Sequence, residues 1–277
     1  GVAPSTVSRT FSRPGRVNAQ TAARIRAVAT ELGYRANPQA RALSTTRTMM
    51  LAVVLADVTN PGFFELVRGA GAAADAAGYT LVLAETQESA ERERDLLEAT
   101  AARVDGIVLA GARGSDAGIH QVSKVVPVVV VNRDVRGVPS VVVDLEHGAR
   151  VTVEHLARLG HTEITYLAGP EASWPDGMRW RSLRQAAQER GMRVRRSGPY
   201  EPTVQGGVCA GERWYSGRGG GTAVVGYNDL LAIGFIRAVT KAGVQVPGDV
   251  SVVGFDNTSS AELISPALTT VAAPMRE

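Results

Sequence analysis

The sequence predicts an α/β protein: two doubly wound, Rossmann-like lobes that follow a small all-α segment at the N-terminus. Three observations lead to this prediction. Short apolar runs alternate with helical or loop segments from residue 50 onward, this alternation starts again past the middle of the chain, and the first 47 residues carry a separate concentration of positive charge. A chain of 277 residues with 44% hydrophobic and 21% charged residues is long enough for more than one globular domain.

Four apolar runs in the first half are typical of buried parallel strands, because each is followed by a segment that can cross back over a sheet. These runs are 51–55, 80–84, 106–110 and 127–131. The second half begins with a helical stripe at Ala149, Thr152, Val153 and Leu156, and strands follow at 163–168, 192–195, 222–226 and 250–255. The clearest helical stripe is Leu231, Phe235, Ala238, Val239 and Ala242. Two consecutive lobes of about 100 residues each are the natural interpretation.

The N-terminal segment differs from the rest in charge. Residues 1–47 hold eight arginines and one acid, a net charge of +7, whereas the whole chain has only +3, so the remaining residues sum to −4. A basic module on a mildly acidic body indicates one part that meets a polyanion and one that does not. The alternative is an ordinary Arg-rich surface, which is the usual role of such runs.

The same segment has the pattern of a helix pair. Pro4 is a good first helical residue, and Val7 and Phe11 lie four apart on one face. After a turn at 12–15, Asn18 is placed to cap a second helix. Its apolar stripe is Ile25, Val28, Ala29 and Leu32, Gly33 ends it, and a third short helix is expected at 39–45.

Three motifs in this segment carry a resemblance. Gly1-Val2 followed by Thr6-Val7-Ser8-Arg9, then Leu32-Gly33-Tyr34-Arg35 with Asn37, then Ala40-Arg41 with Leu43, resemble the DNA-binding headpiece and hinge of the lactose/galactose repressor family. The resemblance implies a helix-turn-helix headpiece at 1–37 and a hinge at 38–48. It also implies that the first helix of the headpiece is missing and that the chain is truncated at both ends. The DNA-binding residues that it indicates are Pro4, Ser5, Thr6, Ser8, Arg9, Arg13, Asn18, Tyr34, Asn37, Ala40, Arg41 and Leu43.

Further matching segments run to the end of the chain, at 57–64, 159–161, 226–229, 246–256 and 266–271. The core of this family is similar to a periplasmic sugar-binding protein, in which two lobes close on a ligand. The resemblance therefore implies a first lobe at 49–161, to which 270–277 returns, and a second lobe at 162–269. In such sheets ligands sit beyond the carboxyl ends of the strands.

Polar side chains that follow the predicted strands are the expected effector-binding groups, because a hydroxyl-rich ligand needs carboxylates, amides, an Arg fork and aromatic faces. The alternative for single Asn and Asp residues is that they only cap helices, and for Phe that it belongs to the core. Arg179 matches the arginine that the family places in its cleft. The set is Asp57, Asn60, Phe63, Phe64, Asn132, Arg133, Trp174, Arg179, Asn228 and Asp256.

Several other kinds of site are not indicated. The glycine-rich run 217–221 precedes a strand and lacks the Lys-Ser/Thr ending of a phosphate loop. The four histidines have no metal-ligand spacing and there is one cysteine, Cys209, which fits a reducing cytoplasm. No Gly-x-Ser-x-Gly elbow is present, and no apolar run approaches the roughly 20 residues that span a bilayer. We therefore expect no enzyme, no cofactor and no metal.

Three classes of function were weighed. The first is a cytoplasmic, ligand-responsive transcriptional regulator, a repressor by the resemblance, that binds a palindromic operator as a homodimer or tetramer and a small effector, a sugar or a related molecule, between the lobes. The second is an extracytoplasmic sugar-binding protein of a transport system, which has no use for residues 1–47. The third is a sugar-processing enzyme, which needs an acid/base pair that the sequence does not offer. The first fits both parts of the chain.

Overall fold

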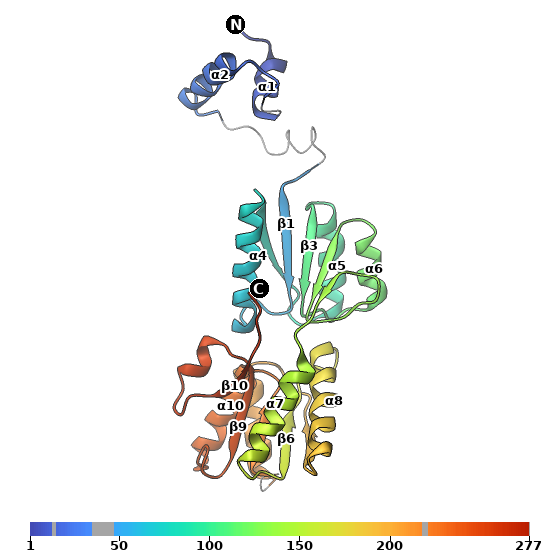
Figure 1. Ribbon diagram of the computed structural model, residues 1–277, viewed down its shortest axis with the longest axis vertical. Helices are drawn as coiled ribbons and strands as arrows, with labels where there is room; N and C mark the ends of the chain where they lie inside the picture. The colour runs from blue at the N-terminus through green and yellow to red at the C-terminus, as the bar shows by residue number, and fades with distance from the viewer. Residues whose placement is uncertain (13–14, 35–46, 218–220, 277) are drawn as a thin grey trace.

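The computed structural model describes residues 1–12, 15–34, 47–217 and 221–276. It contains a pair of short helices and, after them, two five-stranded parallel sheets that form two successive lobes (Figure 1). The all-α segment and the two doubly wound lobes are those that the sequence predicts.

The N-terminal helices are α1 (Pro4–Ser12) and α2 (Ala19–Glu31), and both begin where the sequence predicts. The Asn18 side chain caps α2 by accepting a hydrogen bond from the Gln20 amide at 3.0 Å. Gly33, with φ of +62°, ends the helix. In Figure 1 this pair lies beyond the first lobe, on the side away from the second lobe.

The apolar stripe of α2 is only partly covered, in contrast to the expectation of one buried face. Ile25 and Ala29 are buried against α1, but Val28 is 45% exposed and Leu32 is 75% exposed. The physical reason is that one short helix can cover only one side of a stripe that is about 100° wide.

The first lobe has the strand order β2-β1-β3-β4-β5. Its strands are β1 (Met50–Leu55), β2 (Thr80–Glu85), β3 (Gly106–Ala110), β4 (Val128–Val131) and β5 (Ser140–Val141). Alternate residues of β1 enter two cores: Val53 and Leu55 pack with η1 (Pro61–Phe63) and α4 (Phe64–Ala76), whereas Ala52 and Val54 face the core that includes α5 (Ala90–Ala101) and α6 (Asp116–Ser123). Burial on both faces explains the unbroken apolar run of this strand.

The second lobe has the order β10-β9-β8-β6-β7. Its strands are β6 (Glu163–Leu167), β7 (Arg193–Ser197), β8 (Ala223–Gly226), β9 (Ser251–Asp256) and β10 (Thr269–Ala272). Its helices are α7 (Leu145–Arg158), α8 (Trp174–Glu189), α9 (Val204–Ser216), α10 (Asp229–Lys241) and the short η2 (Ser259–Glu262). One continuous apolar core, in which Tyr166 and Phe235 are fully buried, joins these elements.

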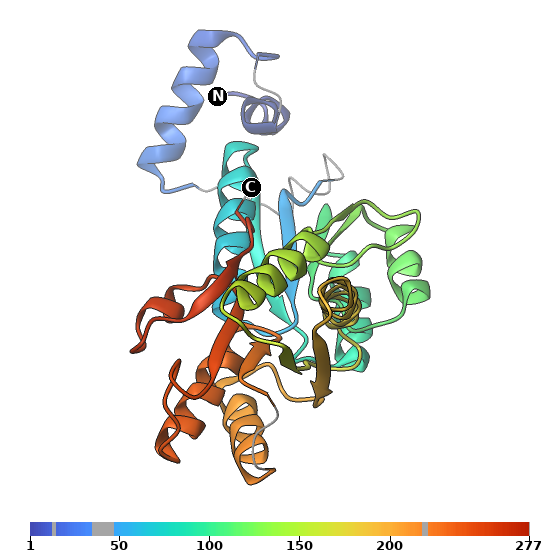
Figure 2. The ribbon, with the colours of Figure 1, turned by 60° about the horizontal axis from the view of Figure 1, so that its bottom comes forward.

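The packing differs from the expected lobe limits in two places. Helix α7, expected in the first lobe, packs on α8, and its Val153 and Leu156 are fully buried in the second core. Strand β10 pairs with β9, so the chain returns to the first lobe only after residue 272. There Met275 packs against the first core and the Arg276 carbonyl contacts Gly69 of α4, beside which the C-terminus lies in Figures 1 and 2.

Helices α9 and α10 approach each other closely because glycines line their contact. A Cβ atom on Gly207 would contact the Leu231 carbonyl and lie 2.8 Å from the Gly234 Cα. Such separations are shorter than side chains tolerate, so both positions require glycine to keep the two backbones in contact.

We expect Gly207→Ala to lower the free energy of unfolding by about 1–3 kcal/mol, because the added methyl forces the helices apart. Gly71→Ala on α4 is the matched control, since its Cβ would meet only one atom, 4.0 Å away. The control should be neutral or stabilising by up to about 1 kcal/mol, the usual gain of Gly→Ala in a helix. Equal effects of the two variants in urea denaturation would contradict this account of the packing.

Asp229, the first residue of α10, holds three segments of the second lobe together. Its carboxylate accepts hydrogen bonds from the Thr258 amide at 2.7 Å, the Thr258 hydroxyl at 3.0 Å and the Thr270 hydroxyl of β10. The residue is fully buried. Burial raises the pKa of Asp229 to about 6, although these hydrogen bonds act in the opposite direction.

This raised pKa predicts a distinct pH dependence of stability. Because folded Asp229 holds its proton up to about pH 6 and the unfolded residue loses it near pH 4, the free energy of unfolding should fall as pH rises through this window. A shift of about two units corresponds to roughly 3 kcal/mol. The stability difference between the wild type and Asp229→Asn, measured by denaturant unfolding, should therefore fall by up to that amount from about pH 4 to about pH 7. A pH-independent difference would refute the assignment.

Candidate functional site

The helix pair presents a polar, basic surface. Pro4, Ser5, Ser8 and Arg9 are exposed on α1, whereas Thr10 is turned inward and its hydroxyl donates to the Thr6 carbonyl at 2.9 Å. Short polar side chains on the outer face let the helix approach a surface closely, and a major groove admits a helix of this kind.

Other expected DNA-binding residues lie around this helix. Of these, Asn18 is engaged as a cap. Arg16, Arg24 and Arg26, which are outside the expected set, add exposed positive charge. The Tyr34 ring, 54% exposed, lies 5.7 Å from the Phe11 ring and joins the end of α2 to α1. Five further expected residues lie outside the described ranges: Arg13, Asn37, Ala40, Arg41 and Leu43.

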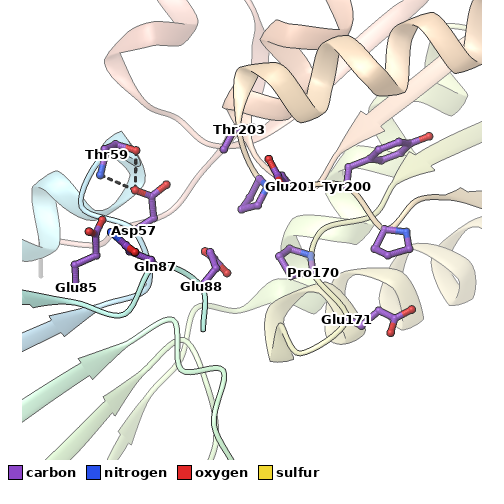
Figure 3. Close-up of a pocket in the computed structure, with 12 residues that line it drawn as sticks. Asp57, Thr59, Glu85, Gln87, Glu88, Pro170, Glu171, Tyr200, Glu201 and Thr203 are labelled. Atoms are coloured by element: carbon purple, nitrogen blue, oxygen red, sulfur yellow. Dashed lines mark hydrogen bonds between the residues drawn. The ribbon is translucent and has the colours of Figure 1, made fainter. Parts of the chain in front are cut away.

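Between the two lobes, the carboxyl ends of the strands surround two adjoining cavities. The outer cavity, of about 770 Å³, is lined by the segments after β1 and β2 on one side and by the segments after β6 and β7 on the other (Figure 3). The inner cavity is much smaller, about 40 Å³, and shares Glu88 and Pro202 with the outer one. Residues from both lobes therefore meet where strand geometry predicts a ligand site.

The inner cavity brings together five of the residues expected from the sequence: Asn60, Phe63, Asn132, Arg179 and Asp256. Asn60 caps η1 by accepting from the Gly62 amide at 2.9 Å, and Phe63 is 9% exposed and also belongs to the first core. Each thus has the structural role that was weighed as the alternative, and at the same time lines the cavity.

Arg179 and Asp256 form the charged pair of this cavity. The Arg179 guanidinium donates to the Tyr227 carbonyl and to Asp256 Oδ1, the latter at 3.3 Å. It lies 4.3 Å from the centre of the Phe255 ring. Its Nε atom has no hydrogen-bond partner within the described part of the chain although the residue is 6% exposed. A buried donor without a partner is costly, so the contacts of the other guanidinium nitrogens with Tyr227 and Asp256 are what hold this cation in place.

Asp256 does not act as a helix cap. The N-cap residue of η2 is Thr258, and no side chain caps this helix. Burial raises the pKa of Asp256, and the neighbouring Arg179 lowers it. Asp256 also has φ of +104°, a backbone conformation that costs a non-glycine residue about 1–3 kcal/mol and is common at binding sites.

The remaining expected residues are placed differently. Asp57 lines the outer cavity, where it accepts from the Thr59 amide and hydroxyl. Phe64 is 50% exposed and lines a separate surface cavity beside Asp256. The Asn228 side chain makes two structural hydrogen bonds. Its Oδ1 accepts from the Leu231 amide as a helix cap, and its Nδ2 donates to the Pro202 carbonyl. Trp174, at the start of α8, lines none of the cavities described.

Arg133 is not among the residues that line either cavity, in contrast to the expectation. It donates to the Gly114 carbonyl at 2.7 Å and to Asp116 at 2.6 Å, which ties the segment after β4 to the start of α6. Arg113, which the sequence analysis did not single out, takes the cavity position instead. Its guanidinium is 3% exposed and is paired with both oxygens of Glu88.

A signal for the missed residues was present in the sequence. Glu88 follows β2, Arg113 follows β3, Tyr227 follows β8, and Tyr200 and Glu201 follow β7. The expected set contains no residue directly after the predicted strands at 80–84, 106–110 and 192–195, although ligand groups sit at such strand ends. After the strand at 222–226 it contains Asn228 but not the adjacent Tyr227.

Two other kinds of site were searched for. Within residues 1–12, 15–34, 47–217 and 221–276, no group of three or more His, Cys, Asp or Glu side chains could hold a metal ion. No helix in these ranges combines the length and the apolar composition needed to cross a membrane.

Comparison with known proteins agrees with this geometry. Residues 1–37 match the family described as bacterial regulatory proteins, lacI family, and residues 153–277 match the periplasmic binding protein-like domain. The HTH-type transcriptional regulator DegA of Bacillus subtilis (strain 168) is 32% identical, with 100% of this chain and 85% of that protein covered.

Solved structures show the same architecture. A lac repressor dimer bound to operator and the anti-inducer ONPF matches with a TM-score of 0.87 and 26% identity, over 100% of this chain and 85% of that one. The transcriptional regulator CelR in complex with cellobiose matches with a TM-score of 0.73 and 28% identity, over 100% and 86%. With full-length identity of 32% to DegA and the family match at its N-terminus, the chain belongs to the lacI family of bacterial regulatory proteins and is a transcriptional regulator rather than an enzyme.

Proposed function

We propose that this regulator binds a palindromic operator as a homodimer through α1 and changes its affinity for DNA when a hydroxyl-rich effector, a sugar or a close relative, binds between the lobes. The observation that carries the proposal is the combination, in one chain, of an exposed polar helix and an inter-lobe cavity lined by the charged pair Arg179 and Asp256. The operator-bound lac repressor dimer and the cellobiose complex of CelR support both halves.

The geometry of α1 supports its role as the recognition helix. Ser5, Ser8 and Arg9 form its exposed surface, and a small surface of this kind can enter a major groove. In a dimer, two such helices would meet successive grooves about 34–36 Å apart, which requires a palindromic site. A DNA-binding role supports a cytoplasmic location for the protein.

The transport alternative has less support. A periplasmic binding protein shares the two lobes, but the match to the lacI family covers residues 1–37, which a transport protein does not need. The relative and the structures described above are transcriptional regulators.

The proposal as a whole is tested by selecting DNA from a random library with the full chain and screening saccharides and nucleosides by thermal shift. We expect palindromes with half-sites about one helical turn apart. An effector at about 100 times its dissociation constant should stabilise the protein by roughly 2.7 kcal/mol. Selection of DNA without any symmetry, or binding equal to that of random DNA, would count against operator recognition.

Arg9 should determine one base of the operator. It is the long basic side chain on the exposed face of α1, and a bidentate contact to guanine is the commonest specific contact. Arg9→Ala should cost about 1–3 kcal/mol on the selected operator and much less on random DNA, as measured by fluorescence anisotropy. Arg237→Ala, an exposed arginine on α10 of the second lobe, is the control and should change neither. If Arg9→Ala lost the same binding free energy on the operator and on random DNA, Arg9 would contact a phosphate and not a base.

Asp256 should be required for the effector but not for DNA. In Asp256→Asn the side chain can still accept from Arg179 but has lost one of its two acceptor atoms and its charge. We expect the affinity for the effector to fall at least tenfold, which corresponds to about 1.4 kcal/mol, with operator binding retained and no longer responsive. Asp75→Asn, an exposed carboxylate on α4, is the control. A normal effector response in Asp256→Asn would remove the residue from the site.

A further inference from the structure

The outer cavity between the lobes is strongly acidic. Among its lining residues there are five carboxylates and neither arginine nor lysine. The first lobe contributes Asp57, Glu85 and Glu88, and the second lobe contributes Glu171 and Glu201. Figure 3 shows these two groups on opposite sides of the cavity.

Most of this negative charge has no cationic partner in the described part of the chain. Glu88 is paired with Arg113, but Asp57 and Glu85 accept only from neutral donors, the Thr59 hydroxyl and the Val58 amide. No hydrogen bond or ion pair of the described residues engages the carboxylates of Glu171 and Glu201. Closing the lobes would bring these like charges together in a medium of lower dielectric, which is unfavourable unless a positive charge lies between them.

The adjoining inner cavity has a different character. Its charges balance, because Arg113 is paired with Glu88 and Arg179 with Asp256. Asn132 and Asp256 line it, and their amide and carboxylate groups can donate to and accept from ligand hydroxyls. A ligand that extends through both cavities would therefore be hydroxylated at its inner end and positively charged at its outer end.

A metal ion does not meet this requirement. No three of the described carboxylates are close enough together to hold one, and the cavity of about 770 Å³ has the size of a site for an organic ligand. Carboxylates spread over two facing walls suit a cation that is itself extended.

We propose that the effector is an oligosaccharide that carries one or more protonated amines, and that the acidic walls select against phosphorylated or carboxylated sugars. This inference rests on the proposed role of the cleft as the effector site and specifies the chemical class that it accepts. An ammonium group between the walls offsets part of the negative charge of Glu171 and Glu201 of one lobe and of the carboxylates of the other, so binding favours the closed arrangement.

The test uses three β-1,4-linked disaccharides of the same ring size, with the full chain in isothermal titration calorimetry at about pH 6, where amines are protonated. The probes are the glucosamine disaccharide, neutral cellobiose and a cellobiose phosphate. Glu171→Gln/Glu201→Gln removes the two unpartnered carboxylates, and Glu98→Gln/Glu212→Gln, both exposed outside the cleft, is the matched control.

We expect the glucosamine disaccharide to bind at least tenfold more tightly than cellobiose, and the phosphate more weakly than either. In Glu171→Gln/Glu201→Gln the diamine should lose about tenfold in affinity and cellobiose less than about threefold, as expected for two partly screened ion pairs. Raising the salt from about 50 to about 500 mM should weaken only the diamine. The control variant should match the wild type.

The same titrations distinguish the proposal of an amine-bearing effector from the assignment of the cleft as the effector site. Equal affinity for the diamine and cellobiose, no response of the diamine to Glu171→Gln/Glu201→Gln, or no binding of the diamine overturns the amine proposal. Cellobiose binding that is lost in Asp256→Asn would, in the same experiment, uphold the cleft as a neutral-saccharide site.

Discussion

The buried guanidinium of Arg179 is the interaction on which the cleft depends. From α8 it reaches the carbonyl of Tyr227 after β8 and the carboxylate of Asp256 at the end of β9, and it lies over the Phe255 ring. One side chain thus fixes the ends of two strands. Because a buried cation without partners costs several kcal/mol, these contacts hold the strand ends in place and keep Asp256 in its strained backbone conformation. The ligand-facing edge of the second lobe is therefore organised before any ligand is present.

The central strands and the edge strands β2 and β7 could be predicted from the sequence, whereas the other two edge strands, β5 and β10, could not. β1 and β8 are buried on both faces, so their apolar runs match the observed strands to within one residue. β5 has two residues, and β10 is a half-exposed Thr-rich strand, so neither has the apolar run that marks a buried strand. The pattern along the chain places the α7 stripe at the start of the second half, as the packing has it, whereas the lobe limits implied by the resemblance assign it to the first lobe. A stripe shows that one face is buried, but not against which sheet.

The candidate site was predictable in position but not in the direction of its side chains. Both Arg133 and Arg113 follow strands of the first sheet, yet only Arg113 lines the inner cavity, where it is paired with Glu88, whereas Arg133 is paired with Asp116. Asn228 also follows a strand, but its side chain is hydrogen-bonded to the Leu231 amide as a helix cap and to the Pro202 carbonyl. Strand order brings such residues to one edge of the sheet. Which of them can bind a ligand depends on whether their polar groups already have hydrogen-bond partners nearby.

Strand β1 connects the two functional ends of the molecule. At its start, Asp105 accepts hydrogen bonds from the Thr48 amide and hydroxyl, both at 2.8 Å, and from the Met49 amide, which fixes the point where the chain enters the first lobe. At its other end the chain continues directly into Asp57 and Asn60 of the cleft. Its last four residues are buried between two cores, and a close-packed strand does not slide against its neighbours. Under the proposed function, a change in the orientation of the lobes around an effector would move residue 48 together with the whole first lobe, so that binding between the lobes would act on the N-terminal helices without rearranging the core.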